Sequence, residues 1–301
     1  MTEPIVYLNG AFIPQSRAAL SLHDTGFVLG ATVTDLCRTF RHQLYRWDDH
    51  LARFRRSCQA AFLTLPLNDI DLTARAQELV AHNTALLKPV QDSALVLFIT
   101  PGPVGYYLGE EGGAGSGPVT FGMHTFPLPF PRYRPLLEHG ATLVVPQIRQ
   151  VSPTSVDPHV KQRSRMHWWL ADRQAQQLQP GSIALLLDEN GHITETAAAN
   201  ILIVRGDTVL SPRRERILQG ISLMIVRELC GELKVPFAEA DLAPEDVLAG
   251  SEAMLTSTPY CIAGVRSLNG QKIPWPGPIY RRLQAAWSER VGVDIAAQIL
   301  R

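Results

Sequence analysis

The sequence predicts an α+β protein. Asn-Gly pairs, the strongest short-range signal for a tight β-hairpin, recur at Asn9-Gly10, Asn190-Gly191 and Asn269-Gly270. Segments with strand character outnumber those with helical character, and together with the hairpins they favour α+β over a doubly wound parallel sheet. A chain of 301 residues is long for a single core, so one large or two medium domains are expected.

The amino-terminal part is expected to begin in a sheet, as strand, Asn9-Gly10 turn and strand. Residues 47–62 predict an amphipathic helix, because their apolar side chains recur at helical spacing and Asp48 can cap the start. A second helix is expected over 69–87. A buried strand over 93–100 and a further strand over 118–126 complete this part.

Two segments without regular structure are expected next. Residues 101–117 are too rich in glycine to pack a core, so they indicate a mobile loop over or beside another part of the protein. Residues 127–135 (PLPFPRYRP) contain four prolines, and proline-dense segments are stiff and support neither a helix nor a central strand. We therefore place a linker at 127–136, between a small domain of residues 1–126 and a large domain of residues 137–301.

The remaining elements lie beyond this linker. Strands are expected at 142–148 and 253–258, in addition to the hairpins at the second and third Asn-Gly pairs. Helices are expected near 162–179, 220–233 and 277–298.

Composition excludes several classes of function. The net charge is zero and the pI is about 7.1, so there is no electrostatic case for binding nucleic acid or an anionic membrane. The amino terminus lacks the basic and apolar regions of a signal peptide, and no apolar run reaches membrane-spanning length. The four cysteines form no C-x-x-C pair, so free buried thiols in a reducing cytoplasm are expected rather than disulfides or a zinc site.

Lys161 is the first of two residues that point to a particular chemistry. Only four of the 28 basic residues are lysines, which makes each lysine noticeable. A lysine amine forms a Schiff base only when it is unprotonated, so it needs partial burial or nearby positive charge, which Arg163 and Arg165 supply. By itself the residue can also be read as a solvated lysine at a helix start.

Glu195 is the second. It follows the Asn190-Gly191 turn on a predicted strand that continues through Ala197, Ala198 and Ala199. An exposed strand gains nothing from such small side chains, so they indicate that a flat group lies against it. A carboxylate beside a pyridine nitrogen keeps that nitrogen protonated, and the protonated ring accepts the electrons of a breaking Cα–H bond. A Schiff-base amine and such a carboxylate are what a pyridoxal phosphate enzyme needs.

Three further places could hold a phosphate group. Gly220, Ile221 and Ser222 stand where a helix begins, and free backbone amides and the helix dipole make such a terminus an anion site. Ser257 and Thr258 add small hydroxyl donors at a strand end. Arg53, on the polar side of the 47–62 helix, can grip a phosphate with two hydrogen bonds. Each alone can equally be a helix cap or a solvated side chain.

Taken together and in this order, these segments resemble the class IV aminotransferases, the fold-type IV pyridoxal phosphate enzymes. The family includes branched-chain and D-amino acid aminotransferases, (R)-selective amine transaminases and aminodeoxychorismate lyase. The matching segments are YLNGAFIP, DTGFVLGATVTDLCRTF, DDHLARFRRSC, the signature E-x-small-x-x-N from Glu195 to Asn200, and ILQGIS. The resemblance covers nearly the whole chain. It implies a small α/β domain and a larger β-rich domain with flanking helices.

The resemblance also implies roles for individual residues. Lys161 is implied to hold pyridoxal 5'-phosphate as an internal aldimine, and Glu195 to face the pyridine nitrogen. The remaining implied cofactor ligands are Arg53, Asn200, Ile221, Ser222, Ser257 and Thr258. A homodimer is implied too, in which the 101–117 loop lines the substrate pocket.

The substrate contacts depart from the family patterns. Branched-chain enzymes have a tyrosine five residues after the lysine, where this chain has Met166, so Asn200 or Arg165 would have to serve the cofactor's phenolic oxygen, or no residue does. The Arg-x-His of D-amino acid aminotransferases is replaced by the glycine-rich loop. The segment DLCR makes Arg38 the leading candidate for a substrate carboxylate contact. His124 and Phe27 are the other candidates for substrate contacts.

The expected function is a ping-pong transamination from an amino acid or amine to a 2-oxo acid. The alternative enzyme is aminodeoxychorismate lyase, which uses the same cofactor for β-elimination and for which Thr34 is a candidate proton-handling hydroxyl. A non-catalytic cofactor-binding protein is the alternative from a different class, and the missing tyrosine at Met166 is what favours it.

Overall fold

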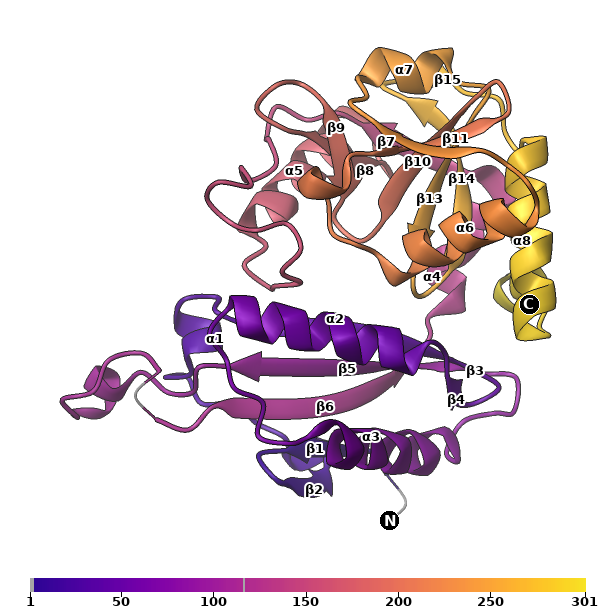
Figure 1. Ribbon diagram of the computed structural model, residues 1–301. Helices are drawn as coiled ribbons and strands as arrows, with labels where there is room; N and C mark the ends of the chain where they lie inside the picture. The colour runs from indigo at the N-terminus through magenta and orange to yellow at the C-terminus, as the bar shows by residue number, and fades with distance from the viewer. Residues whose placement is uncertain (1–2, 116) are drawn as a thin grey trace. The chain divides into compact units, whose positions relative to one another are not determined.

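The computed structural model describes residues 3–115 and 117–301, which form two compact units (Figure 1). Unit 1 contains residues 1–128 and returns for residues 160–165, whereas unit 2 contains residues 129–159 and 166–301. Residues 160–165, which include Lys161, therefore belong by their contacts to unit 1, although residues 129–159 of unit 2 come directly before them in the sequence. Helices and strands are mixed in both units, as α+β predicts.

Unit 1 is built on an antiparallel sheet with the order β2-β1-β6-β5-β3-β4. Its strands are β1 (Ile5–Leu8), β2 (Ala11–Pro14), β3 (Val33–Phe40), β4 (Gln43–Leu44), β5 (Ser93–Thr100) and β6 (Thr120–Pro127). The first hairpin turns at Asn9 and Gly10, both with positive φ, which is the backbone that the Asn-Gly pair predicts.

Two helices cover one face of this sheet. They are α2 (Trp47–Ala60) and α3 (Asp69–Thr84), and shorter helical turns occur at η1 (Gln15–Arg17), α1 (Thr25–Val28) and η2 (Gly105–Leu108). Phe54 and Leu79 from the two helices share a buried cluster with Cys37, Leu97 and Met123 of the sheet. The opposite face of the sheet carries Thr34, Phe98 and His124, because side chains alternate along a strand.

The expected cap of α2 is wrong. Asp48 lies inside the first helical turn, and the N-cap position is Arg46, whose backbone is left-handed and whose side chain makes no cap bond. The acidic pair Asp48 and Asp49 still suits the positive end of the helix dipole.

The proline-rich segment is a helix, α4 (Phe130–His139), and not the irregular linker that was expected. Pro131 falls in the first turn, where an N–H group has no helical partner in any case, so only Pro135 removes a hydrogen bond from the helix. The two units separate between Leu128 and Pro129, directly before this helix.

Unit 2 contains a mixed sheet that closes on itself. Successive pairings run β10-β13-β14-β7-β8-β9, and β9 pairs again with β10. Its strands are β7 (Ala141–Val144), β8 (Ile183–Leu187), β9 (Ile193–Thr196), β10 (Asn200–Arg205), β11 (Thr208–Pro212), β12 (Phe237–Ala240), β13 (Glu252–Ser257), β14 (Cys261–Leu268) and β15 (Gln271–Lys272). The closure matters for the site, because it sets Glu195 of β9 directly opposite Asn200 of β10.

Helices pack around this closed sheet. They are α4, α5 (Met166–Leu178), η3 (Arg214–Arg216), α6 (Ile221–Glu232), α7 (Pro244–Ala249), α8 (Pro278–Val291) and α9 (Ile295–Leu300). The single terminal helix expected over 277–298 is in fact two, because Gly292 adopts a left-handed backbone that ends α8. Asp294 then caps α9.

Candidate active site

Lys161 is held at the edge of β3 by backbone hydrogen bonds. The Thr34 N–H donates to the Lys161 carbonyl at 2.9 Å, and the Arg163 N–H donates to the Thr32 carbonyl at 2.9 Å. A β-bridge between Val33 and Gln162 lies between them. Residues 161–163 are thus extended, and the helix expected from 162 begins only at Met166. The Lys161 N–H donates to the Ser57 hydroxyl of α2 at 3.1 Å, so both β3 and α2 fix this backbone.

Arg53 lies in a buried cluster beneath this segment. Its Nε and Nη2 donate to the two carboxylate oxygens of Asp35 on β3, each at 2.8 Å, a bidentate pair. His50, one helical turn before Arg53, places its Nδ1 2.8 Å from Asp35 Oδ1. All three residues are at most 4% exposed. Asp35 therefore fixes the orientation of the Arg53 guanidinium through a buried ion pair.

The charges of this cluster act on one another. Burial disfavours the Asp35 carboxylate, but the charges and hydrogen bonds of Arg53 and His50 outweigh burial and hold the pKa of Asp35 well below its usual range. Burial lowers the pKa of His50, and the charges of Arg53 and Lys161 lower it further, against the effect of Asp35. At neutral pH the imidazole is therefore neutral, with its proton on Nδ1 toward Asp35.

The substrate residues predicted in unit 1 are dispersed. Arg38 stands four residues beyond Thr34 on β3, roughly 13 Å along the strand. It is 1% exposed, and its guanidinium lies 3.8 Å from Asp92 and over the ring of Phe40. This placement gives no support to a contact between Arg38 and the substrate carboxylate. Phe27, on α1, is 74% exposed.

His124 and Thr34 share the sheet face that α2 and α3 leave uncovered. Burial lowers the pKa of His124, and the positive charge of Arg163 lowers it further, so these two side chains influence each other directly. The Thr34 hydroxyl donates to the Leu97 carbonyl at 2.7 Å and accepts from Arg163 Nη2 at 3.4 Å. A hydroxyl engaged in this way is poorly suited to the proton transfer that the lyase alternative assigns to Thr34.

Glu195 occupies the end of β9 in unit 2, and the three alanines that follow form a turn, not the strand that was expected. The Thr196 N–H donates to the Ala199 carbonyl at 2.9 Å, which reverses the chain into β10. Glu195 is 9% exposed. Small side chains are needed here because the chain must reverse within three residues and bring Asn200 beside Glu195.

The Leu218 backbone and the Asn200 side chain both contact the Glu195 carboxylate. The Leu218 N–H donates to Oε1 at 3.2 Å, and the Asn200 side-chain amide donates to Oε2 at 3.2 Å. Asn200 Nδ2 also donates to the Leu218 carbonyl at 3.0 Å. Both N–H bonds of the Asn200 amide are directed to these acceptors, so Asn200 is placed to position Glu195. It is not placed to contact the cofactor's phenolic oxygen in the way of the tyrosine that Met166 replaces.

The amino terminus of α6 adjoins this pair. Gly220 is its N-cap, and a Cβ added there would lie 2.1 Å from the Asn200 Oδ1 atom, so no larger residue fits. Gly220 supplies no side-chain cap, and Ser222, in the first turn of the helix, is only 4% exposed. Ile221 and Ser222 thus begin a helix whose first N–H groups are available to an anion.

Ser257 ends β13, which pairs with β10. Its hydroxyl donates to the Ala198 carbonyl at 2.6 Å and thereby ties the alanine turn to the end of β13. Thr258 follows in the loop. The buried Thr256 hydroxyl has no partner within the described residues, and its backbone lies opposite Asn200. The structure therefore groups Glu195, Asn200, the start of α6 and the end of β13 within unit 2, just as it groups Lys161 and Arg53 within unit 1.

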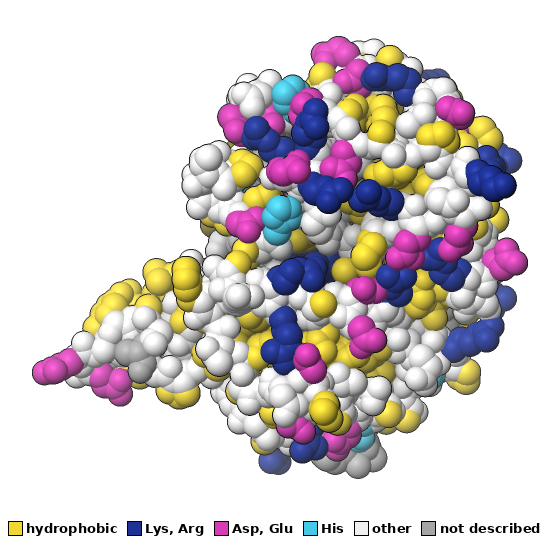
Figure 2. Space-filling model, viewed as in Figure 1, with side chains coloured by type: hydrophobic (Ala, Val, Ile, Leu, Met, Phe, Trp, Pro, Cys, Tyr) yellow, Lys and Arg dark blue, Asp and Glu magenta, His cyan; other side chains and the backbone are white. Residues whose placement is uncertain are grey.

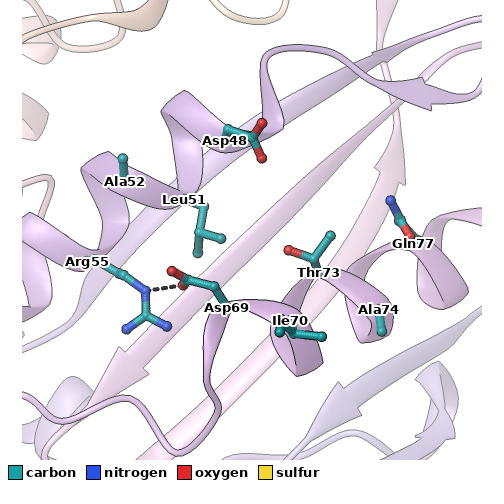
Figure 3. A pocket seen from close by; sticks show the side chains of 9 residues that line it. All are labelled: Asp48, Leu51, Ala52, Arg55, Asp69, Ile70, Thr73, Ala74 and Gln77. Atoms are coloured by element: carbon teal, nitrogen blue, oxygen red, sulfur yellow. Dashed lines mark hydrogen bonds and ion pairs between the residues drawn. The ribbon is translucent and has the colours of Figure 1, made fainter.

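A groove between α2 and α3 lies apart from these residues (Figure 3). Leu51, Ala52 and Ala74 form its apolar part, and Ile70 and the ion pair of Arg55 with Asp69 stand at its rim. Trp47 donates to Thr73 across the two helices at 2.9 Å. No residue of the Lys161 group lines it, and we assign it no chemistry.

The viewed surface shows basic and acidic side chains interspersed (Figure 2). Exposed ion pairs in unit 2 join Arg213 to Asp241, Arg214 to Glu239 and Arg216 to Glu189. Such pairing balances opposite charges locally on this unit, in keeping with the zero net charge. Among the described residues, no helix combines the length and the apolar character needed to cross a membrane.

Sequence reasoning missed three of the residues that organise the site. Asp35 and His50 become recognisable only when α2 packs on β3, since their separations from Arg53 in sequence are unequal and cross a turn. The Leu218 N–H is a backbone donor, which no sequence pattern identifies. A buried arginine needs a carboxylate partner. The one sequence signal for this contact was therefore Asp35, an acidic residue within a largely apolar strand.

Comparison with known proteins identifies the fold and then the family. The structure resembles the branched-chain amino acid aminotransferase of Escherichia coli with a TM-score of 0.87 at 19% identity, over 95% of this chain and 94% of that one. It resembles a T.th. branched-chain amino acid aminotransferase, solved with pyridoxamine 5'-phosphate, with a TM-score of 0.84 over 96% and 94% of the two chains, also at 19% identity. These likenesses establish the fold.

The sequence establishes the family. Residues 32–268 match the model of the amino-transferase class IV family, and the chain belongs to this family. In sequence it is 25% identical to a D-alanine aminotransferase of Bacillus licheniformis, over 98% of this chain and 99% of that protein. The protein is therefore a class IV aminotransferase, an enzyme, so the non-catalytic alternative is set aside.

Proposed function

We propose that this protein is a pyridoxal 5'-phosphate-dependent transaminase that moves an amino group from a donor to a 2-oxo acid, with Lys161 as its catalytic residue. The observation that carries the proposal is the intact Glu195–Asn200 signature within a chain of the class IV family. Its geometry supports the role: the Glu195 carboxylate is nearly buried and is oriented by the Leu218 N–H and the Asn200 amide.

The residues present fit this cofactor. Lys161 offers an amine on a backbone fixed by Thr34 and Ser57. The Ser222 hydroxyl fits a phosphate group at the start of α6, and Gly220 lets the backbone approach closely. Arg53, Ile221, Ser257 and Thr258 would complete the phosphate contacts.

When bound, the cofactor supplies an electron sink for the bond at the substrate Cα. The chain's own residues do the rest. Glu195 would hold a proton on the ring nitrogen of the cofactor, and Asn200 keeps the Glu195 carboxylate in place. Lys161 Nζ would take the Cα proton of the amino donor and hold it for return to the cofactor, so one amine would serve as base and then as acid. Release of the first product before the second substrate binds gives ping-pong kinetics.

The test is spectroscopic. The purified protein is expected to be yellow, with a visible absorption band that borohydride abolishes and that an amino donor converts to the pyridoxamine form. Lys161→Ala is expected to be colourless and inactive. A Lys161→Ala protein that keeps the same visible band and the same sensitivity to borohydride would refute the assignment of Lys161.

We also propose that the enzyme is a homodimer. Exposed apolar side chains gather in two segments of unit 1, which are Leu20, Leu22, Phe27 and Leu29 near α1, and Tyr106, Tyr107 and Leu108 in η2. Exposed apolar residues so close in sequence favour burial against another chain. Analytical ultracentrifugation should give twice the mass of 33.2 kDa, and a monomer at micromolar concentration would contradict the proposal.

The four cysteines are buried and free. Burial raises the pKa of Cys58 to about 12 and that of Cys230 to about 11, so these thiols are unreactive at neutral pH. They support a protein that works in a reducing compartment such as the cytoplasm.

A further inference from the structure

Arg163 is a guanidinium without an acidic partner. Its Nη2 lies 3.4 Å from the Thr34 hydroxyl, and no carboxylate within the described residues forms an ion pair with it. The side chain is exposed to solvent, yet the surrounding protein is dense enough to lower the pKa of the guanidinium through desolvation alone. A cation in such a position is stabilised by an anion from outside the chain.

The position of Arg163 relative to Lys161 is fixed by the backbone. Residues 161–163 are extended, and the Arg163 N–H is bonded to the Thr32 carbonyl. Two residues in an extended chain separate their Cα atoms by at most about 7 Å. A small substrate that reacts at Lys161 Nζ therefore has its other polar groups within reach of the long Arg163 side chain.

His124 adds a second polar group on the same face of the sheet. Thr34 lies opposite Phe98, which lies opposite Gly122, and the next row on this face is Leu36, Val96 and His124. Thr34 and His124 are therefore on one face of the sheet, and the charge of Arg163 is felt at the half-buried His124. A neutral imidazole on this face can donate a hydrogen bond to a substrate without adding a second positive charge.

We propose that Arg163 binds the carboxylate of the substrate, with Thr34 and His124 beside it, and that the enzyme therefore acts on 2-amino acids and 2-oxo acids and not on simple amines. The inference rests on the proposed transaminase function and names the substrate class of that same site. A carboxylate matches the fork of the guanidinium with two charge-assisted hydrogen bonds. Arg163 replaces Arg38 in this role, because the charge of Arg38 is buried against Asp92.

The experiment compares Arg163→Gln with Arg56→Gln. Arg56 is exposed on α2 and lies outside the Lys161 group, so its substitution removes the same charge from unit 1 without touching the site. Each protein is titrated with 4-methylvalerate, a monocarboxylate that cannot be transaminated, and binding is measured by calorimetry. In parallel, conversion of the visible band is followed with an L- and D-amino acid panel and with 1-phenylethylamine, which has no carboxylate.

Arg163→Gln is expected to weaken 4-methylvalerate binding and to lower kcat/KM for the best amino acid by about 10- to 100-fold, the range for a hydrogen bond to a charged group. Arg56→Gln should change neither, and Arg163→Lys should recover part of the loss because it restores the charge. Thermal melting checks that each variant is folded.

Either arm can overturn the inference. Equal binding of 4-methylvalerate by wild type and Arg163→Gln, or no binding by wild type, would refute the carboxylate contact. Conversion of 1-phenylethylamine at a rate equal to that of amino acids would refute the substrate class. Failure of the proposed function has a different signature, which is a wild-type protein whose visible band no donor converts, while the binding arm still decides the role of Arg163.

Discussion

The Lys161 group of unit 1 and the Glu195 group of unit 2 are held in place by different physics. In unit 1 the organising contacts are buried charges, with Asp35 bonded to Arg53 through both carboxylate oxygens and to His50. In unit 2 they are backbone groups and an amide, with Leu218 and Asn200 around Glu195 and with Ser257 tied to the alanine turn. One group depends on charge balance and the other on the path of the chain.

The difference teaches which substitutions each group can tolerate. Removing one partner of a buried ion pair leaves the other charge in a medium of low dielectric. Such a substitution in unit 1 should therefore lower the free energy of unfolding. Around Glu195 an isosteric change alters chemistry more than folding, whereas a change of backbone volume alters folding. The predictions below test this contrast, from the largest expected effect to the smallest.

The largest effect is expected from Asp35→Asn. This change removes the charge that balances Arg53 within a cluster that is at most 4% exposed. The expected loss is about 3–5 kcal/mol of unfolding free energy, measured by urea denaturation followed by circular dichroism. Asp48→Asn, an exposed change on the same helix as Arg53, is the matched control and should lose at most about 1 kcal/mol, through its place at the start of the helix. The same urea midpoint for both variants would show that the Asp35 charge does not stabilise the cluster.

Glu195→Gln comes next, and it should act on catalysis and not on folding. The glutamine oxygen can still accept from the Leu218 N–H, but the charge that we propose to hold a proton on the cofactor's ring nitrogen is gone. We expect kcat to fall on the order of 10²–10³-fold, the range for loss of one preorganised electrostatic contact, with little change in melting temperature. Stopped-flow measurement of the half-reaction checks this. A large fall in stability with unchanged kcat would reverse the contrast between the two units.

Gly220→Ala tests the dependence of unit 2 on backbone volume. The added Cβ would meet the Asn200 Oδ1 atom at 2.1 Å, so Asn200 must move and lose its grip on Glu195. Overpacking of this kind costs about 1–3 kcal/mol. Gly231→Ala, in the same helix α6 with open space at its Cβ, should instead stabilise by about 0.5–1 kcal/mol. Opposite shifts in melting temperature are expected, and equal shifts would argue against the close packing at Gly220.

The smallest effect concerns pH. The pKa of His50 is lower in the folded protein than its ordinary value of about 6.5, so below that pH the unfolded chain takes up a proton that the folded cluster excludes. Stability therefore falls as the pH drops from 6.5, by at most about 1.4 kcal/mol per pH unit for this group. Asp35 also lowers the stability as the pH falls, but only below about pH 4, because its lowered pKa keeps the carboxylate ionised in the folded protein.

His50→Gln should flatten the curve of melting temperature against pH between about 6.5 and about 5.5, just below the ordinary pKa of histidine. His124, whose pKa is also lowered, contributes with the same sign, so His124→Gln is the matched comparison and the double variant should be flatter than either. Unchanged slopes in His50→Gln would show that folding does not shift the pKa of this imidazole, and a steeper slope would show that folding raises it.

Elements with a strong local signal were predictable from the sequence. The buried strand over 93–100 is β5, and the amphipathic helix over 47–62 is α2, because periodicity and apolar content determine such elements locally. The prediction failed at α4, where four prolines suggested an irregular linker although only Pro135 removes a hydrogen bond from the helix. It also failed at the alanines after Glu195, since small side chains suit a tight turn as well as a strand.

The site shows the same division. Lys161, Glu195 and Asn200 stand out through residue type and spacing, and their roles remain predictions for the experiments above. What fixes their geometry was out of reach of the sequence, because Asp35 finds Arg53 only through packing and Leu218 acts through its backbone. Arg163 was noticed only as nearby charge, and what distinguishes it is its extended backbone two residues after Lys161 and its contact with the Thr34 hydroxyl.

The return of residues 160–165 to unit 1 has a consequence for biosynthesis. As the polypeptide leaves the ribosome, the backbone of Thr32 and Thr34 cannot bond to residues 161–163 until all of residues 129–159 have been made. A nascent chain stalled near residue 128 carries a nearly finished sheet with no amine at its edge. Lys161, the proposed catalytic residue, thus joins unit 1 only after synthesis of unit 2 has begun.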